Sequence, residues 1–254
     1  MSRVRETTAR LPGARAFYRA LKSLPGQLRG LPPISYSHIN GRLIRDYVGR
    51  DDPTILDIGC NDGSTTLWML ELFERPRIYC FEPDPRAAAR FKTKVGGRPN
   101  VTLIELALSD REGMVDFYQS DGRRDNKWLA QAMPQGWDLS GSIKPPYRHT
   151  AVHPGITFDR KIEVPTSTLD AMCEKYGIGP IDFIWLDVQG AEAEVFRGAP
   201  KTLAKTRFLY SEYSDRELYK GQLGLRGMLE HLPDFRVLVR YPGDVLLRND
   251  NTPA

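Results

Sequence analysis

The stretch Thr54-Ile-Leu-Asp-Ile-Gly-Cys-Asn-Asp-Gly63, followed by Ser64-Thr65-Thr66, decides the fold of this 254-residue chain. Its first half is a short apolar and β-branched run, which is typical of a buried strand. Its second half holds two glycines that permit a sharp turn, and the hydroxyl residues after them open a helical segment. A strand, a glycine turn and a helix in this order predict the first crossover of a parallel α/β sheet.

The turn carries an acid where a dinucleotide-binding turn has the first glycine of G-x-G-x-x-G. Asp57 would repel a pyrophosphate, but it suits a ligand without phosphate that bears a cationic amino group and a sulfonium, such as S-adenosylmethionine. Gly59 and Gly63 would then let the backbone pass close beneath that ligand. The other contacts expected from this turn are Asn61, Ser64 and Thr65. The alternative left open is that Asp57 only caps the following helix.

A second acid follows the next strand-like run, residues 78–81. Glu82 lies about two dozen residues after the turn, where a carboxylate accepts hydrogen bonds from both ribose hydroxyls, with Pro83 beside it. Each motif alone is weak, and Glu82 could be an ordinary exposed acid. Together, in strand order, the two motifs favour a nucleoside site.

The rhythm of the chain after residue 54 predicts the architecture. Short strand-like runs alternate with helical segments, at 54–58, 78–81, 101–105, 183–186 and 208–210. This alternation predicts a Rossmann-like, doubly wound, mostly parallel sheet with helices on both faces. Residues 235–240 and 244–247 are joined by three residues, which leaves no room for a helix and predicts a C-terminal antiparallel hairpin.

Two acids end neighbouring predicted strands and are the first candidates for chemistry. Asp187 ends the fourth strand and Glu212 the fifth, so both should lie at the carboxyl edge of the sheet, where such folds bind ligands. Methyl transfer to oxygen needs a proton acceptor, and Asp187 is the preferred base, also in contact with the cofactor. The same two acids could hold Mg²⁺. His149 is the rival base, together with His38 and His153.

The ordered motifs at 57–63, 81–85, 168–170 and 187–192 resemble the FkbM family of methyltransferases, and residues 195–199 and 210–213 fit the same pattern. The resemblance implies a seven-stranded sheet, S-adenosylmethionine as donor and, frequently, O-methylation of sugars. It also places Ala107, Leu108 and Ser109 beside the adenine. The chain departs from the family at Gln189, where glutamate is common, so a carboxylate role there is not carried over. Gln189 and Glu192 are expected to contact the acceptor.

Residues 120–161 show no sustained periodicity, and a segment of this length in a compact domain is usually a functional lid or disordered. We expect an insert or lid over the acceptor site, with Asn126 and Trp128 contacting a sugar or other small polar acceptor. The alternative is that its aromatic residues form a small core of their own.

The first 50 residues are expected to form an N-terminal helical extension to a methyltransferase domain over 51–254. Apolar residues recur at helical spacing over 11–24, and a second helix should begin after Ser37 as N-cap and end at Gly49. The first helix is basic. It would pack on the domain, join a homodimer or lie on a membrane surface, and the sequence does not choose among these.

Composition favours a folded cytoplasmic enzyme: 41% of residues are hydrophobic, 27% are charged, and the net charge is +4. We expect no membrane span, because no apolar run approaches roughly 20 residues, and no signal peptide. Cys60, Cys80 and Cys173 have no metal-binding spacing and are expected to be reduced core residues.

Two other functions are compatible with the cofactor motif. An RNA methyltransferase is suggested by the basic surplus, but a base-amine methylase needs an Asn/Asp-Pro-Pro-aromatic turn after the fourth strand, and residues 187–190 read Asp-Val-Gln-Gly. Lys-Pro-Pro-Tyr at 144–147 begins with a cation and lies in the insert. The second alternative is a non-catalytic S-adenosylmethionine-binding protein.

Overall fold

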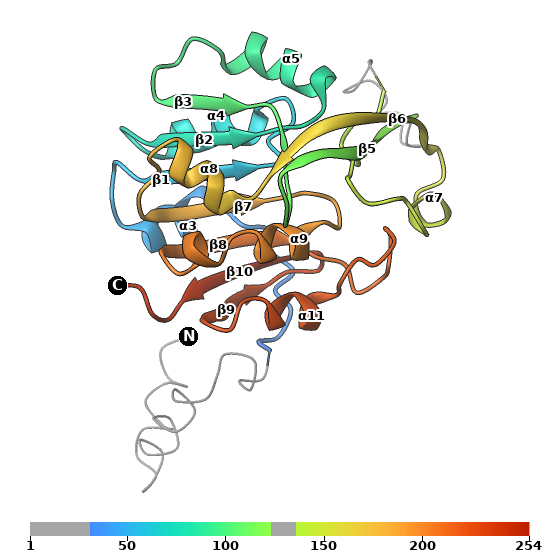
Figure 1. Ribbon diagram of the computed structural model, residues 1–254. Helices are drawn as coiled ribbons and strands as arrows, with labels where there is room; N and C mark the ends of the chain where they lie inside the picture. The colour runs from blue at the N-terminus through green and yellow to red at the C-terminus, as the bar shows by residue number, and fades with distance from the viewer. Residues whose placement is uncertain (1–30, 123–135, 254) are drawn as a thin grey trace, which may run out of the picture.

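The computed structural model describes residues 31–122 and 136–253, and its central element is a seven-stranded sheet in the order β3-β2-β1-β7-β8-β10-β9 (Figure 1). The strands are β1 (Thr54–Ile58), β2 (Arg77–Phe81), β3 (Val101–Ile104), β7 (Ile181–Leu186), β8 (Thr206–Glu212), β9 (Phe235–Arg240) and β10 (Asp244–Asn249). Strands β1, β2, β3, β7 and β8 pair in parallel, whereas β10 runs antiparallel to both of its neighbours. The predicted mostly parallel sheet with an antiparallel C-terminal hairpin is confirmed.

Helices cover both faces of this sheet, as the doubly wound prediction requires (Figure 1). One face carries α3 (Gly41–Val48), α4 (Ser64–Leu72) and α5 (Pro85–Val95), and the other carries α8 (Leu169–Lys175), α9 (Glu192–Arg197), α10 (Pro200–Leu203) and α11 (Leu225–Glu230). Two hydrophobic layers result, one on each side of the sheet. The three cysteines are buried and free, as expected.

Strand β1 supplies side chains to both layers. All five of its residues are buried, because helices cover the strand on both faces. Ile55 packs in the layer under α3 and α4, whereas Leu56 and Ile58 pack in the opposite layer. Since side chains alternate along a strand, Asp57 points to the same side as Ile55, toward α4.

The strand order reverses between β1 and β7, which lie side by side in the middle of the sheet. From β1 the chain builds outward through β2 and β3, and from β7 it builds in the other direction through β8. The loops that leave the carboxyl ends of β1 and β7 therefore diverge and open a crevice between them. This crevice is where the candidate site lies.

A second sheet, which the sequence did not predict, covers the carboxyl edge of the first. It consists of β4 (Ala107–Leu108), β6 (Ile156–Ser167) and β5 (Gly113–Gly122), in that order, and β5 pairs with β6 from Gly113↔Thr166 to Gly122↔Ile156. The end of β5 and the start of β6 lie within residues 120–161, the segment that was expected to lack periodicity. The pattern was obscured because the sheet buries only a small cluster, which includes Phe117 and Val164. The short helix α7 (His149–Val152) precedes β6.

Helix α3 begins three residues later than expected. Its N-cap is Asn40, whose side-chain oxygen accepts a hydrogen bond from the Leu43 amide at 3.0 Å. The hydroxyl of Ser37, the predicted cap, lies 2.7 Å from the hydroxyl of Ser35 instead. The predicted end is confirmed, because Gly49 adopts the left-handed conformation with φ 67°.

Several expectations fall outside the described residues. These are the basic helix over 11–24 and the acceptor contacts Asn126 and Trp128. Within the two described ranges, none of the helices combines the length and the apolar character needed to cross a membrane.

The β1 turn generates a prediction about stability. Gly59 has φ 82°, and a Cβ atom there would lie 1.8 Å from the Asp187 carbonyl oxygen. We expect Gly59→Ala to lower the free energy of unfolding by more than about 2 kcal/mol, because it adds a backbone clash to left-handed strain. Gly177→Ala is the matched control: its φ is 61° with nothing within 4 Å of the added Cβ, so it should lose only about 1 kcal/mol. Equal losses in urea titrations of the two variants would contradict the close approach.

Candidate active site

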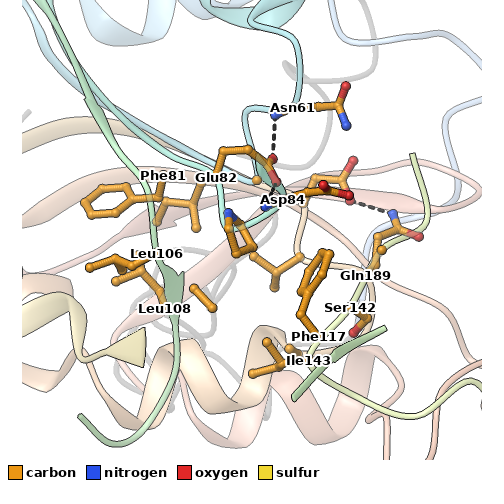
Figure 2. A pocket seen from close by; sticks show the side chains of 18 of the residues that line it. Asn61, Phe81, Glu82, Asp84, Leu106, Leu108, Phe117, Ser142, Ile143 and Gln189 are labelled. Carbon is orange, nitrogen blue, oxygen red and sulfur yellow. Dashed lines mark hydrogen bonds between the residues drawn. The ribbon is translucent and has the colours of Figure 1, made fainter. Parts of the chain in front are cut away.

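A pocket opens at the carboxyl ends of β1, β2, β4 and β7, over the crevice between β1 and β7 (Figure 2). Eight of the predicted site residues line this pocket: Gly59, Asn61, Glu82, Pro83, Ala107, Leu108, Asp187 and Gln189. Residues from four separate stretches of sequence therefore meet at one edge of the sheet, as predicted. The pocket is closed on its outer side by residues 138–139 and 141–143 of the insert.

The turn after β1 forms the inner side of the pocket. Gly59 and Gly63 both have a left-handed backbone, and Gly63 packs against Phe91 of α5. Asn61 is also left-handed, with φ 45°, which is uncommon for a residue other than glycine. Ser64 starts α4, and its hydroxyl donates to Asp62, so it does not line the pocket, and neither does Thr65.

Glu82 presents a buried carboxylate to the pocket. Its side chain accepts one backbone hydrogen bond from Asn61 and one from Asp84, each 2.8 Å long (Figure 2). A carboxylate offers about four lone-pair directions, so two remain for a ligand. The residue is only 5% exposed, and burial raises the pKa of Glu82 to about 8.

The sequence analysis expected Asp57 to contact the ligand, but Asp57 does not line the pocket. It is fully buried beneath the turn, and its Oδ2 accepts a hydrogen bond from the Thr66 hydroxyl of α4 at 2.5 Å. Among the described residues its Oδ1 has no hydrogen-bond partner. Burial raises the pKa of Asp57 to about 7. The alternation of β1 is the reason, because it directs this side chain toward α4.

The middle of the pocket is lined by apolar side chains. Leu106 and Leu108 line one side, and Phe117 and Ile143 come from the second sheet and the segment before it (Figure 2). Ser109 lies outside this lining, because its hydroxyl turns to Thr166 at 2.7 Å.

Asp187 and Glu212 come together at the ends of β7 and β8, as predicted. The side-chain nitrogen of Gln189 lies between them and donates to Asp187 Oδ1 at 2.6 Å and to Glu212 Oε2 at 2.5 Å. Burial, and next the neighbouring Asp187 carboxylate, hold the pKa of Glu212 well above its usual range.

This arrangement does not fit the Mg²⁺ ion that the sequence analysis considered. A hydrogen-bond donor, the Gln189 amide, stands between the two carboxylates where a cation would have to be. In the described ranges no group of three or more acids, histidines or cysteines is arranged to hold a metal ion.

His149 and Glu192 lie behind the pocket wall. The His149 ring is buried and packs 5.3 Å from the Tyr219 ring and 5.0 Å from the Phe158 ring, so Tyr219 separates it from Gln189. Glu192 is buried and accepts a hydrogen bond from the Gly190 amide at 3.1 Å. Burial raises its pKa to about 7. Neither residue lines the pocket.

The structure adds residues that sequence reasoning missed, and they hold the insert against the pocket. Arg90 of α5 forms an ion pair with Asp138, whose carbonyl also accepts from the Asn61 side-chain amide at 3.2 Å. Tyr219 donates to the Ser140 carbonyl at 2.7 Å. These partners are far apart in the chain, and no local pattern marks them.

The family match and the relative with the higher identity both name a methyltransferase. Residues 57–244 match the family described as the methyltransferase FkbM domain. The chain is 48% identical over 212 residues to 2-O-methyltransferase NoeI of Sinorhizobium fredii (strain NBRC 101917 / NGR234), covering 82% of this chain and 84% of that protein. It is 25% identical over 223 residues to the AMB antimetabolite synthetase AmbE of Pseudomonas aeruginosa, covering 78% of this chain but 10% of that protein.

Among solved structures, the fold is similar to Aeropyrum pernix fibrillarin with natively bound S-adenosyl-L-methionine. That match has 17% identity and a TM-score of 0.39, over 80% of this chain and 67% of the other. Precorrin-6y C5,15-methyltransferase from Geobacter metallireducens GS-15 matches with 12% identity and a TM-score of 0.41, over 85% and 90%.

Proposed function

The chain belongs to the FkbM family of methyltransferases, and on that premise we propose that it moves the methyl group of S-adenosylmethionine to a hydroxyl oxygen at the 2-position of a sugar. The observation that carries the proposal is the pair of acids, Asp187 and Glu212, at the end of the cofactor pocket. The name 2-O-methyltransferase of the 48% identical relative supports oxygen as the acceptor atom and the 2-position.

The chemistry of the pocket lining supports S-adenosylmethionine as its ligand. We infer that the free lone pairs of Glu82 accept the ribose hydroxyls, and that the adenine lies between Leu108 and Phe117. Gly59 and Asn61 would then lie beneath the ribose and methionine parts, which lead toward Asp187. When bound, the cofactor supplies an electrophilic methyl group on a positively charged sulfur.

The acids supply what a hydroxyl acceptor needs. An alcohol oxygen attacks the methyl carbon well only if its proton has somewhere to go, and a positioned base provides this. Asp187 lines the pocket and Glu212 lies next to it, and burial together with the Asp187 carboxylate raises the pKa of Glu212. We assign the acceptor proton to this pair, with Asp187 facing the pocket and Glu212 behind it.

The direct test uses labelled S-adenosylmethionine and a panel of mono- and oligosaccharides. Label should enter the sugars and be absent from the corresponding 2-deoxy sugars, because they lack the accepting oxygen. RNA and protein serve as further acceptors in the same assay. Transfer to RNA alone, or equal transfer to 2-deoxy sugars, would contradict the proposal.

The buried Glu82 generates a prediction about pH. Because its pKa is about 8, it is mostly protonated at pH 7, whereas ribose hydroxyls donate best to the ionised form. The affinity for S-adenosylhomocysteine should therefore rise roughly tenfold per pH unit up to about pH 8 and then level off. In Glu82→Gln this dependence should disappear and affinity at pH 8 should fall by about 1–3 kcal/mol.

Calorimetry across pH 6 to 9 measures both effects. Glu105→Gln is the matched control, because Glu105 is an exposed acid at the next strand end, paired with Lys92. The assignment of Glu82 fails if the wild-type and Glu82→Gln proteins show the same pH dependence.

The acid pair generates a prediction about turnover. Glu212→Gln should lower kcat by roughly 100-fold, as expected for loss of a proton acceptor, while the cofactor affinity changes little, because Glu212 does not line the pocket. Asp187→Asn should act in the same direction. Glu230→Gln, an exposed acid at the end of α11, is the control. Steady-state rates that survive both changes would place the base elsewhere.

A further inference from the structure

Gln189 is held in an unfavourable backbone conformation at the edge of the pocket. Its φ is 53°. Among the described residues, Gln189 and Asn61 are the two residues other than glycine that have a positive φ. Such a conformation is unfavourable for a residue with a side chain and persists only where the surroundings enforce it. A glycine would adopt it freely, so the presence of a side chain here points to a use for that side chain.

The Gln189 amide matches its two acceptors. Its nitrogen carries two hydrogens, and one acceptor lies at 2.6 Å on Asp187 and the other at 2.5 Å on Glu212. A neutral amide can donate to both carboxylates at once without adding charge. A glutamate in this place could donate to one at most, when protonated, and would otherwise add a third negative charge to the cluster.

Tyr219 fixes which way this amide faces. Its hydroxyl carries one hydrogen, which is shared between two acceptors, the Ser140 carbonyl oxygen at 2.7 Å and Gln189 Oε1 at 3.2 Å. Because this hydrogen faces the amide oxygen and the two carboxylates accept hydrogen bonds, the amide nitrogen is directed toward the acids. Tyr219 is 1% exposed, among the largest fully buried side chains in the described part of the chain. Its ring packs against Phe158 and His149, which leaves it little freedom to move.

We propose that Gln189 is a positioning residue for methyl transfer, which holds Asp187 and Glu212 in one arrangement, and that Tyr219 acts through Gln189. The inference rests on the proposed function for its role in turnover. Each acid uses one carboxylate oxygen for the amide, and Asp187 is the acid of the pair that lines the pocket and can face the acceptor hydroxyl. We call the chain of hydrogen bonds from Tyr219 through Gln189 to the two acids the relay. The bond from Tyr219 to the Ser140 carbonyl connects this relay to the insert, whose neighbouring residues 138–139 and 141–143 line the pocket.

The relay predicts a distinctive kinetic pattern. Gln189→Leu should lower kcat by at least about tenfold, because a small displacement of a reacting group has a large effect on rate. Tyr219→Phe, which removes one oxygen, should lower kcat about three- to tenfold. The KM for the acceptor and the affinity for S-adenosylhomocysteine should change less than about twofold, since neither hydrogen bond of the amide is made to a ligand.

Combining the two changes tests whether Tyr219 acts through Gln189. The double variant should have the kcat of Gln189→Leu alone, because the tyrosine has nothing left to orient. Tyr176→Phe, an exposed tyrosine directly after α8 and outside the pocket lining, is the control and should retain the wild-type rate. Multiplicative losses in the double variant, or equal losses in kcat and cofactor affinity, would overturn the proposal.

A measurement without turnover separates this inference from the proposed function. In nuclear magnetic resonance spectra, both side-chain amide protons of Gln189, assigned by their loss in Gln189→Leu, should be shifted downfield by their bonds to two carboxylates. Glu212→Gln and Tyr219→Phe should each move them. If no sugar accepts label but these shifts occur, the proposed function fails and the relay stands. The relay itself is refuted if the Gln189 amide protons have ordinary chemical shifts and neither substitution changes them.

Discussion

The Gly59 backbone lies close to the Asp187 carbonyl oxygen. The arrangement of the pocket residues at the carboxyl edge of the sheet depends on this contact. It joins the ends of the two central strands, β1 and β7, where the strand order reverses. A side chain at position 59 would force these ends apart, and with them Asn61 on one loop and Gln189 on the other. Both residues have strained backbones, so their positions are fixed by this junction and not by local preference.

Three buried carboxyl groups lie in or behind the pocket: Glu82 lines it, whereas Asp57 and Glu192 lie behind its wall. Burial raises the pKa of Asp57 to about 7, of Glu82 to about 8 and of Glu192 to about 7. Groups so close to neutrality respond strongly to a nearby charge, and a cation favours their ionised forms. A sulfonium with an ammonium group supplies positive charge at this edge, whereas a pyrophosphate would worsen the repulsion.

Much of this arrangement was predictable, and the part that was not has a physical reason. The β-branched runs at 54–58 and 235–240 predicted strands with the observed bounds, because local pattern determines them. The direction of Asp57 was also implicit, since it follows Ile55 by two residues and must share its face. In contrast, the contacts Arg90–Asp138 and Tyr219–Gln189 join segments 48 and 30 residues apart. Tertiary packing brings these residues together, and no local pattern in the sequence marks them.

The second sheet also holds the insert in place beside the pocket. Gln119 of β5 donates to Asp84 at the end of β2 at 2.8 Å, and Arg86 of α5 bonds both Asp84 and the Ser120 carbonyl. The insert is thereby fastened to the same loop that carries Glu82. Substitutions on the pocket side of the insert can alter the acceptor wall while these fastenings keep the cofactor residues in place. On the proposed function, acceptor preference would then depend on the insert, and donor binding on the turns after β1 and β2.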